Sequence, residues 1–139
     1  MPTCLIVDDI ELIRRVLRHM LTSLGFEVRE ADSADAALEL CDHAMPDLVL
    51  LDWQMPGLSA HEFVLALRAR RHGSFPRIIY CTTNADVVAI ARMMASGCND
   101  FLLKPFDRRD LVGRLEAHNL AVPADADTGR SGALVTVRS

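Results

Sequence analysis

Two kinds of hydrophobic periodicity alternate along the chain up to about residue 120. Uninterrupted apolar runs at 4–7, 48–51 and 101–103 are typical of strands buried on both faces of a parallel sheet. Residues 76–81 are expected to form the fourth strand and 99–103 the fifth, whereas 26–31 alternates and predicts a more exposed strand. Between these runs, apolar residues recur every three or four positions, which is the spacing of amphipathic helices. The sequence therefore predicts a single α/β domain, a doubly wound (βα)5 flavodoxin-like sandwich with a five-stranded parallel sheet.

The expected helix boundaries rest on capping residues and on glycines. Residues 59–62 have the S-x-x-E form of a capping box, in which a serine and a glutamate satisfy the first backbone N–H groups of a helix. The residues expected to begin helices are Asp32 or Ser33, Ser59, Asn84 and Asp107. The residues expected to lie at helix ends are Gly25, Gly73 and Gly97.

The periodicity stops after Val122. Residues 123–139 are small and polar for most of their length and are expected to form a flexible tail, so the folded domain is assigned to 1–122. The short apolar run 134–137 has no evident partner strand. With no second domain in view, we expect the domain to act through its own surface.

Composition and charge narrow the function classes. The formal net charge of −4 disfavours a general nucleic-acid-binding surface, so no DNA partner is expected. The four cysteines lack metal-ligand or redox-motif spacing and predict buried free thiols of a reducing compartment. No signal sequence or membrane span is evident, so we expect a cytoplasmic protein without membrane contact.

Charged or hydroxyl side chains lie where four of the predicted strands end. Asp8 and Asp9 follow the first strand, Asp52 follows the third, Thr82 ends the fourth and Lys104 follows the fifth. The carboxyl ends of parallel strands share one edge of a sheet, where ligands bind in open α/β folds. Three carboxylates favour Mg²⁺, and an ammonium and a hydroxyl suit phosphate oxygens. The pattern predicts a site for a divalent cation and a phosphoryl group.

Each of these residues also has an ordinary structural interpretation. Asp8 or Asp9 could cap the helix at 10–24, and Asp52 could be a loop carboxylate. Thr82 could simply open a helix, and Lys104 could be a surface lysine. Their common position at strand carboxyl ends is what favours a shared site.

This constellation, with Lys104-Pro105, resembles the receiver domain of bacterial two-component response regulators over about residues 2–120. The resemblance implies that Asp52 accepts a phosphoryl group from a histidine kinase or phosphotransfer protein. It also implies that Asp9, Asp52 and the backbone carbonyl of Gln54 bind Mg²⁺, with Asp8 acting through water. Thr82 and Lys104 would hold phosphoryl oxygens, and the Lys104-Pro105 peptide would be cis.

The resemblance further places Phe101 at the position of an aromatic switch residue. Phosphorylation would draw Thr82 toward the phosphoryl group and let the Phe101 ring rotate, which would change a protein-binding face at 84–118. Phe101 lacks the hydroxyl of the tyrosine common at this position. Within the family, the runs at 4–9, 50–53 and 81–84 are similar to single-domain chemotaxis regulators. Such a protein is not an enzyme beyond its own phosphorylation and dephosphorylation.

Two alternatives remain open at this point. A Mg²⁺-dependent phosphatase with an aspartyl nucleophile, as in the haloacid-dehalogenase group, would carry D-x-D after its first strand, whereas Asp8 and Asp9 are adjacent. A non-switching interaction module of the same fold would have lost part of the site. The cluster Arg68, Arg70, Arg71 and His72 predicts a solvated helix end, with a nucleotide- or acid-binding patch as the alternative.

Overall fold

The computed structural model describes residues 1–52, 57–83, 86–120 and 136–137. Its central sheet is parallel, with strand order β2-β1-β3-β4-β5. The strands are β1 (Thr3–Val7), β2 (Glu27–Ala31), β3 (Leu48–Asp52), β4 (Arg77–Thr82) and β5 (Asp100–Leu103). The helices are α1 (Glu11–Ser23), α2 (Ala34–His43), α3 (Ala60–Arg68), α4 (Val87–Ser96) and α5 (Arg108–Ala117). The predicted doubly wound five-stranded fold is confirmed.

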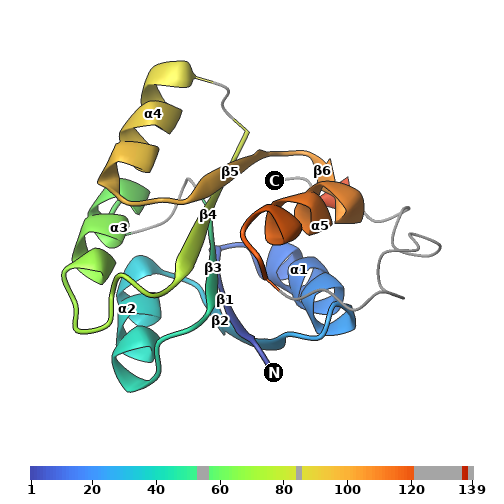
Figure 1. Cartoon of the computed structure of the whole chain (residues 1–139), viewed down its shortest axis with the longest axis horizontal. Helices are drawn as coiled ribbons and strands as arrows, with labels where there is room; N and C mark the ends of the chain where they lie inside the picture. The colour runs from blue at the N-terminus through green and yellow to red at the C-terminus, as the bar shows by residue number, and fades with distance from the viewer. Residues whose placement is uncertain (53–56, 84–85, 121–135, 138–139) are drawn as a thin grey trace.

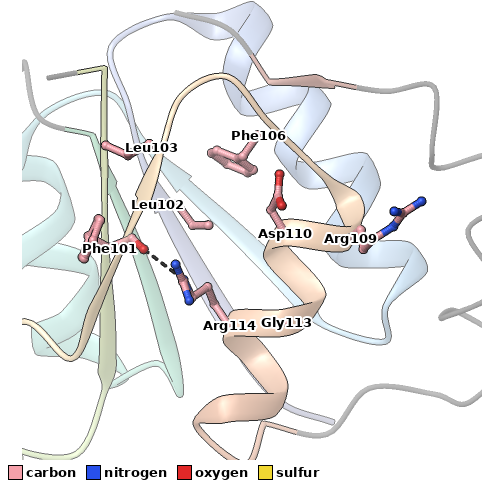
Figure 2. A pocket seen from close by; sticks show the side chains of 8 residues that line it. All are labelled: Phe101, Leu102, Leu103, Phe106, Arg109, Asp110, Gly113 and Arg114. Atoms are coloured by element: carbon pink, nitrogen blue, oxygen red, sulfur yellow. Dashed lines mark hydrogen bonds between the residues drawn. The ribbon is translucent and has the colours of Figure 1, made fainter. Parts of the chain in front are cut away.

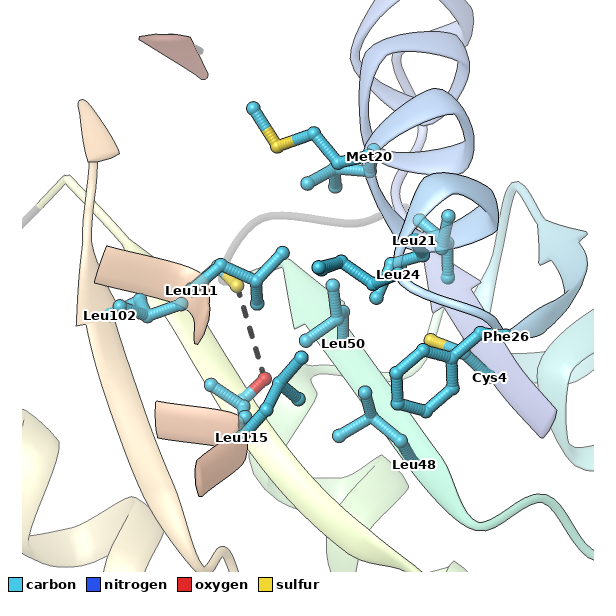
Figure 3. Packing of buried hydrophobic residues seen from close by; sticks show 14 of the residues in the cluster. Cys4, Met20, Leu21, Leu24, Phe26, Leu48, Leu50, Leu102, Leu111 and Leu115 are labelled. Carbon is cyan, nitrogen blue, oxygen red and sulfur yellow. Dashed lines mark hydrogen bonds between the residues drawn. The ribbon is translucent and has the colours of Figure 1, made fainter. Parts of the chain in front are cut away.

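Helices cover both faces of this sheet (Figure 1). Helices α1 and α5 lie on one face, and α2, α3 and α4 lie on the other. The side chains of each strand alternate between the two cores, because successive residues of a strand point to opposite faces. Leu50 of β3 packs under α1 and α5 (Figure 3), while its neighbours Val49 and Leu51 pack under the opposite helices. This double burial explains why β1, β3 and β4 appear in the sequence as unbroken apolar runs.

Local capping chemistry begins three helices where the sequence predicted it. Ser33 accepts a hydrogen bond from the backbone N–H of Ala36 at the start of α2. Complete capping boxes open α3, between Ser59 and Glu62, and α5, between Asp107 and Asp110. These bonds satisfy N–H groups that have no partner within the helix.

Two predicted boundaries are wrong. Helix α4 begins at Val87 with Asp86 as its cap, and the predicted cap Asn84 lies outside the described residues. Helix α3 ends at Arg68 rather than near Gly73, because the chain folds back on the helix end there. A Cβ atom at Gly73 would lie 2.0 Å from the carbonyl oxygen of Leu67, so this close approach requires glycine.

Arg68 stabilises the chain segment that follows α3. Its guanidinium donates hydrogen bonds to the carbonyl oxygens of Gly73, Pro76 and Gly97 and to Oδ1 of Asn99. It therefore joins the end of α3 to the loops that precede β4 and β5. The expectation of a solvated basic cluster is wrong for Arg68, although Arg71 is exposed.

Replacing Arg68 by alanine is expected to lower the free energy of unfolding by about 3 kcal/mol, because several partly buried oxygens lose their donor. Urea denaturation of Arg68→Ala beside the exposed-site control Arg71→Ala measures this difference, and the control should stay within about 0.5 kcal/mol of wild type. Equal stability of the two variants would show that the loop oxygens find other partners.

All four cysteines are free and buried, as predicted. Burial raises the pKa of the Cys41 thiol to about 11 and those of Cys81 and Cys98 to about 12, and it also raises that of Cys4. These thiols are therefore protonated parts of the core rather than nucleophiles.

A short second sheet lies beside α5. Strand β6 (Phe106–Asp107) pairs antiparallel with β7 (Thr136–Val137), so the expectation that the run 134–137 has no partner strand is wrong for these two residues. Residues 121–135 lie outside the described part of the chain, and the domain limit at 122 stays a prediction. Among the described residues, no helix has the length and apolar character needed to cross a membrane.

Candidate functional site

Three carboxylates meet where β1 and β3 end. These strands are neighbours in parallel register, with Val7 opposite Leu51, so the residues that follow them project from the same edge of the sheet. One carboxylate oxygen from each of Asp8, Asp9 and Asp52 lies within 4.8 Å of the others. Asp8 and Asp52 are buried and Asp9 is exposed, so the cluster opens to solvent on one side.

Lys104 directly follows β5, the outer strand of the sheet, and its side chain reaches this cluster. Its backbone N–H donates to the carbonyl oxygen of Thr82, which fixes the end of β5 against β4. Its Nζ lies 2.8 Å from Oδ1 of Asp52 and 3.5 Å from Oδ2 of Asp8. The lysine is 6% exposed, so the contacts exclude most water. The Lys104-Pro105 peptide bond is cis, as the family resemblance implied.

The electrostatics of the site follow from burial and from these charges. Burial raises the pKa of Asp8, and the negative charge of Asp52 raises it further, against the opposing effects of the Ile10 N–H and Lys104. Burial alone would lower the pKa of Lys104, but the hydrogen bond and charge of Asp52 outweigh it and raise that pKa. One ammonium faces three carboxylates, so the cluster is suited to an added cation.

Asp8 and Asp9 do not cap helix α1. The residue at the cap position is Ile10, which makes no side-chain cap bond. Asp8 instead accepts a hydrogen bond from the Ile10 N–H at 2.9 Å, while Arg14 donates to the Asp8 carbonyl oxygen at 2.7 Å. These bonds hold the Asp8 carboxylate at the cluster and leave the capping interpretation unsupported.

Thr82 lies at the carboxyl end of β4, one residue beyond the partner of Asp52. The register places Asp52 opposite Cys81, and Thr82 is only 1% exposed. Its side chain opposes the rise that burial causes in the pKa of the Tyr80 hydroxyl. The structure thus brings the predicted hydroxyl to the same edge as the carboxylates and Lys104.

Phe101 lies near the start of β5, three residues before Lys104. It is half-buried and packs against the core beneath α2, α3 and α4. Arg114 of α5 places its guanidinium 5.9 Å from the centre of the Phe101 ring and donates to the Phe101 carbonyl oxygen at 3.1 Å (Figure 2). A pocket of about 570 Å³ lies between β5 and α5 beside this contact, lined also by Leu103 and Arg109.

The predicted ligand Gln54 lies outside the described residues. The same is true of Trp53, which follows Asp52 in the sequence, and of Asn84. Of the predicted site residues, those that the structure places are Asp8, Asp9, Asp52, Thr82, Lys104 and Phe101.

Comparison with known proteins agrees with this geometry. The family model of the response regulator receiver domain matches residues 4–116. The chain belongs to this family. The receiver domain is a signalling module of two-component systems, and the sequence resemblance is thereby confirmed.

Solved receiver structures superpose closely on this one. The chemotaxis response regulator CheY4 of Vibrio cholerae has a TM-score of 0.80 and 32% identity, over 84% of this chain and 98% of that one. The receiver domain of the sensor histidine kinase PA1611 from Pseudomonas aeruginosa, described with a magnesium ion coordinated in its active site cleft, has a TM-score of 0.77 and 29% identity. That match covers 84% of this chain and 95% of the other.

Curated relatives include longer regulators. The phosphate regulon transcriptional regulatory protein PhoB of Rhizobium meliloti is 33% identical over 84% of this chain and 52% of its own length. The chemotaxis protein CheY of Pseudomonas aeruginosa is 31% identical over 81% of this chain and 91% of its own length. The chain thus spans about half the length of the PhoB relatives and most of the CheY relative.

Sequence reasoning missed two residues that contact the site or the switch position. Tyr80 appeared as one apolar member of a core strand, and only its two-residue spacing from Thr82 could have indicated a shared face. Arg114 gave no signal, because a contact from α5 to β5 depends on how the helix packs.

Proposed function

We propose that this receiver domain accepts a phosphoryl group on Asp52 from a histidine kinase or phosphotransfer protein. The observation that carries the proposal is the buried contact of 2.8 Å between Lys104 Nζ and the Asp52 carboxylate, beside Asp8 and Asp9. The Asp52 side chain lies at the carboxyl end of β3, and the ammonium group of Lys104 lies beside it. That arrangement suits nucleophilic attack on phosphorus.

In the proposed step an Asp52 carboxylate oxygen forms a bond to the incoming phosphorus. The bond from phosphorus to the donor breaks, and the donor leaves with the bonding electron pair as an imidazole or, for acetyl phosphate, as acetate. The product on the protein is an acyl phosphate. Lys104 then pairs with a phosphoryl oxygen, and the Thr82 hydroxyl donates to another, which together offset the added negative charge.

The residues proposed to hold Mg²⁺ are Asp9, Asp52 and the Gln54 carbonyl, with Asp8 through water. The donor set fits the ion, because Mg²⁺ prefers carboxylate, carbonyl and water oxygens and the cluster lies partly open to solvent. A bound Mg²⁺ would supply positive charge to the transferring phosphoryl group. The magnesium ion described in the PA1611 receiver supports this assignment by similarity.

The output of the domain is proposed to run through Thr82 and Phe101 to a protein partner on the face formed within 84–118. The pocket between β5 and α5 and the exposed side chains of Val87 and Val88 supply apolar surface on that face. Arg114 holds both the ring and the carbonyl oxygen of Phe101, so a change at Phe101 would reach α5 directly.

The pathway is proposed only in outline. Relatives include chemotaxis proteins and transcriptional regulators, so chemotaxis remains one candidate and is not singled out. We place the protein in the cytoplasm, where histidine kinases present their phosphoryl groups. The formal net charge of −4 gives no reason to propose DNA binding by this domain. The PhoB relatives are nevertheless named as transcriptional regulatory proteins.

Incubation with acetyl phosphate tests the proposal and separates it from the phosphatase alternative. With Mg²⁺ present, intact-mass measurement should show one phosphoryl group on the wild type and none on Asp52→Asn, while the exposed-site control Asp32→Asn labels normally. Sustained hydrolysis of a phosphomonoester without a labelled protein would instead favour a phosphatase. Labelling that leaves the 84–118 amide spectrum unchanged would favour a module that does not switch.

Charge reversal on the proposed output face should change partner binding without changing chemistry. Arg92 is exposed on α4 and Arg109 lines the pocket beside β5. We expect Arg92→Glu or Arg109→Glu to weaken phosphorylation-dependent binding of a partner about 10-fold or more while Asp52 labels at the wild-type rate. Arg71→Glu serves as the matched control, and loss of binding in that control alone would relocate the output face.

A further inference from the structure

Tyr80 is the only tyrosine in the chain and lies in β4, between β3 and β5 of the sheet. It is 7% exposed, and its side chain belongs to the core cluster that contains Phe63 and Met93. In the register of β4 and β5 it lies directly opposite Phe101, so the two rings occupy neighbouring places on the same face of the sheet. Tyr80 is therefore next to the predicted switch residue.

The hydroxyl of Tyr80 contacts the reacting edge of the domain. Tyr80 and Thr82 are two residues apart on one strand, so their side chains point to the same face, and the Thr82 side chain opposes the rise that burial causes in the pKa of the Tyr80 hydroxyl. Thr82 is the residue proposed to donate to the phosphoryl group on Asp52. Movement of the Thr82 hydroxyl toward that group would take this polar neighbour away from the phenol.

Tyr80 also lines a groove between α3 and α4. This groove has a volume of about 540 Å³ and is also lined by Ala60, Val88 and Met93. Helices α3 and α4 lie side by side on this face of the sheet (Figure 1), and a hydrogen bond between His61 Nδ1 and Ser96 Oγ joins them. The groove is open to water, so it offers the phenol a new partner when Thr82 withdraws. A buried hydroxyl without any partner would be costly.

We propose that Tyr80 reports the state of Asp52 to the groove between α3 and α4. In the unphosphorylated protein its hydroxyl is held by Thr82, and in the phosphorylated protein it turns toward the groove and changes the surface between the two helices. Tyr80 is thus a positioning residue that acts through Thr82. The inference rests on the proposed function, because it requires phosphorylation of Asp52.

The single tyrosine makes a direct test possible. The full chain is labelled with tyrosine carrying ¹³C at Cζ, which gives one resonance that responds to hydrogen bonding of the phenol. Phosphorylation by acetyl phosphate and Mg²⁺ should shift this resonance in the wild type and in Thr82→Ser. In Thr82→Val the resonance should already differ from that of the unphosphorylated wild type, and phosphorylation should not move it further.

A second variant tests the consequence at the groove. Tyr80→Phe removes only the hydroxyl, and it should lose most of the phosphorylation-dependent amide shifts of Ala60, Val88 and Met93 while Asp52 still labels. A Tyr80 resonance that stays fixed in phosphorylated wild type, or that shifts equally in Thr82→Val, would overturn the inference alone. A wild-type protein that acquires no phosphoryl group would overturn the proposed function and this inference with it.

Discussion

Lys104→Ala is expected to lower the free energy of unfolding at neutral pH by about 3 kcal/mol, because it leaves buried carboxylates without their cation. Lys104 contacts both Asp52 and Asp8 and is almost fully buried, so no other described side chain takes its place beside them. The variant should still accept a phosphoryl group on Asp52, because the carboxylate nucleophile and the proposed metal ligands remain. It should fail to change the 84–118 face, since no ammonium then binds the phosphoryl oxygen.

The stability difference should also depend on pH in a definite direction. The pKa of Asp8 is raised in the folded protein, so the folded state binds this proton more tightly than the unfolded state. The contribution of this tighter proton binding to the free energy of unfolding is therefore present at low pH, and it is lost as the pH rises through the pKa of Asp8 in the folded protein. Without Lys104 the pKa of Asp8 rises further, so the destabilisation should be largest near neutral pH and should shrink toward about pH 4.

Urea denaturation of wild type and Lys104→Ala across this pH range measures the effect, and Lys104→Arg is the matched control that keeps the charge. A variant as stable as wild type at neutral pH would show that the buried pair contributes nothing to folding. A Lys104→Ala variant that switches its surface normally would contradict the role assigned to the lysine.

Asp9→Asn is expected to weaken Mg²⁺ binding about 10-fold or more, because one of the two carboxylates proposed to bind the ion directly loses its charge. At limiting Mg²⁺ the rate of Asp52 labelling should fall by a similar factor, and high Mg²⁺ should restore much of it. Removing Mg²⁺ with a chelator should slow labelling of the wild type about 100-fold, in line with several kcal/mol of charge stabilisation by a metal.

Calorimetry gives the Mg²⁺ affinity, and the fluorescence of Trp53, the only tryptophan in the chain, gives an independent signal. Asp32→Asn should bind Mg²⁺ as the wild type does. Wild-type labelling that proceeds equally fast with a chelator present would show that the cluster of Asp8, Asp9 and Asp52 does not use a metal.

The sequence predicted the fold well because the determining signals are local. Apolar runs identified the strands, and Ser59 and Asp107 began their helices through bonds to residues three positions away. The convergence of Asp8, Asp52 and Lys104 was predictable for a related reason. Parallel strands fix which end of each strand faces the ligand, so residues distant in sequence could be placed at one edge.

The failures share a dependence on long-range contacts. The end of α3 is set by Gly73 close to the helix end and by Arg68, which bonds to loops that precede two other strands. The pairing of Thr136 with Asp107 joins segments far apart in sequence, and two residues carry too little pattern to reveal it. The Tyr80 contact with Thr82 was hidden because a tyrosine in a core strand resembles any other apolar residue.

The most direct test of the central claim identifies the residue that carries the phosphoryl group. Protein treated with acetyl phosphate and Mg²⁺ is reduced with borohydride, which converts an aspartyl phosphate to homoserine, and is then digested and sequenced by mass spectrometry. The account predicts homoserine at position 52 and aspartate at positions 8 and 9. Modification at any other residue, or an unmodified residue 52 in protein that carries a phosphoryl group, would contradict it.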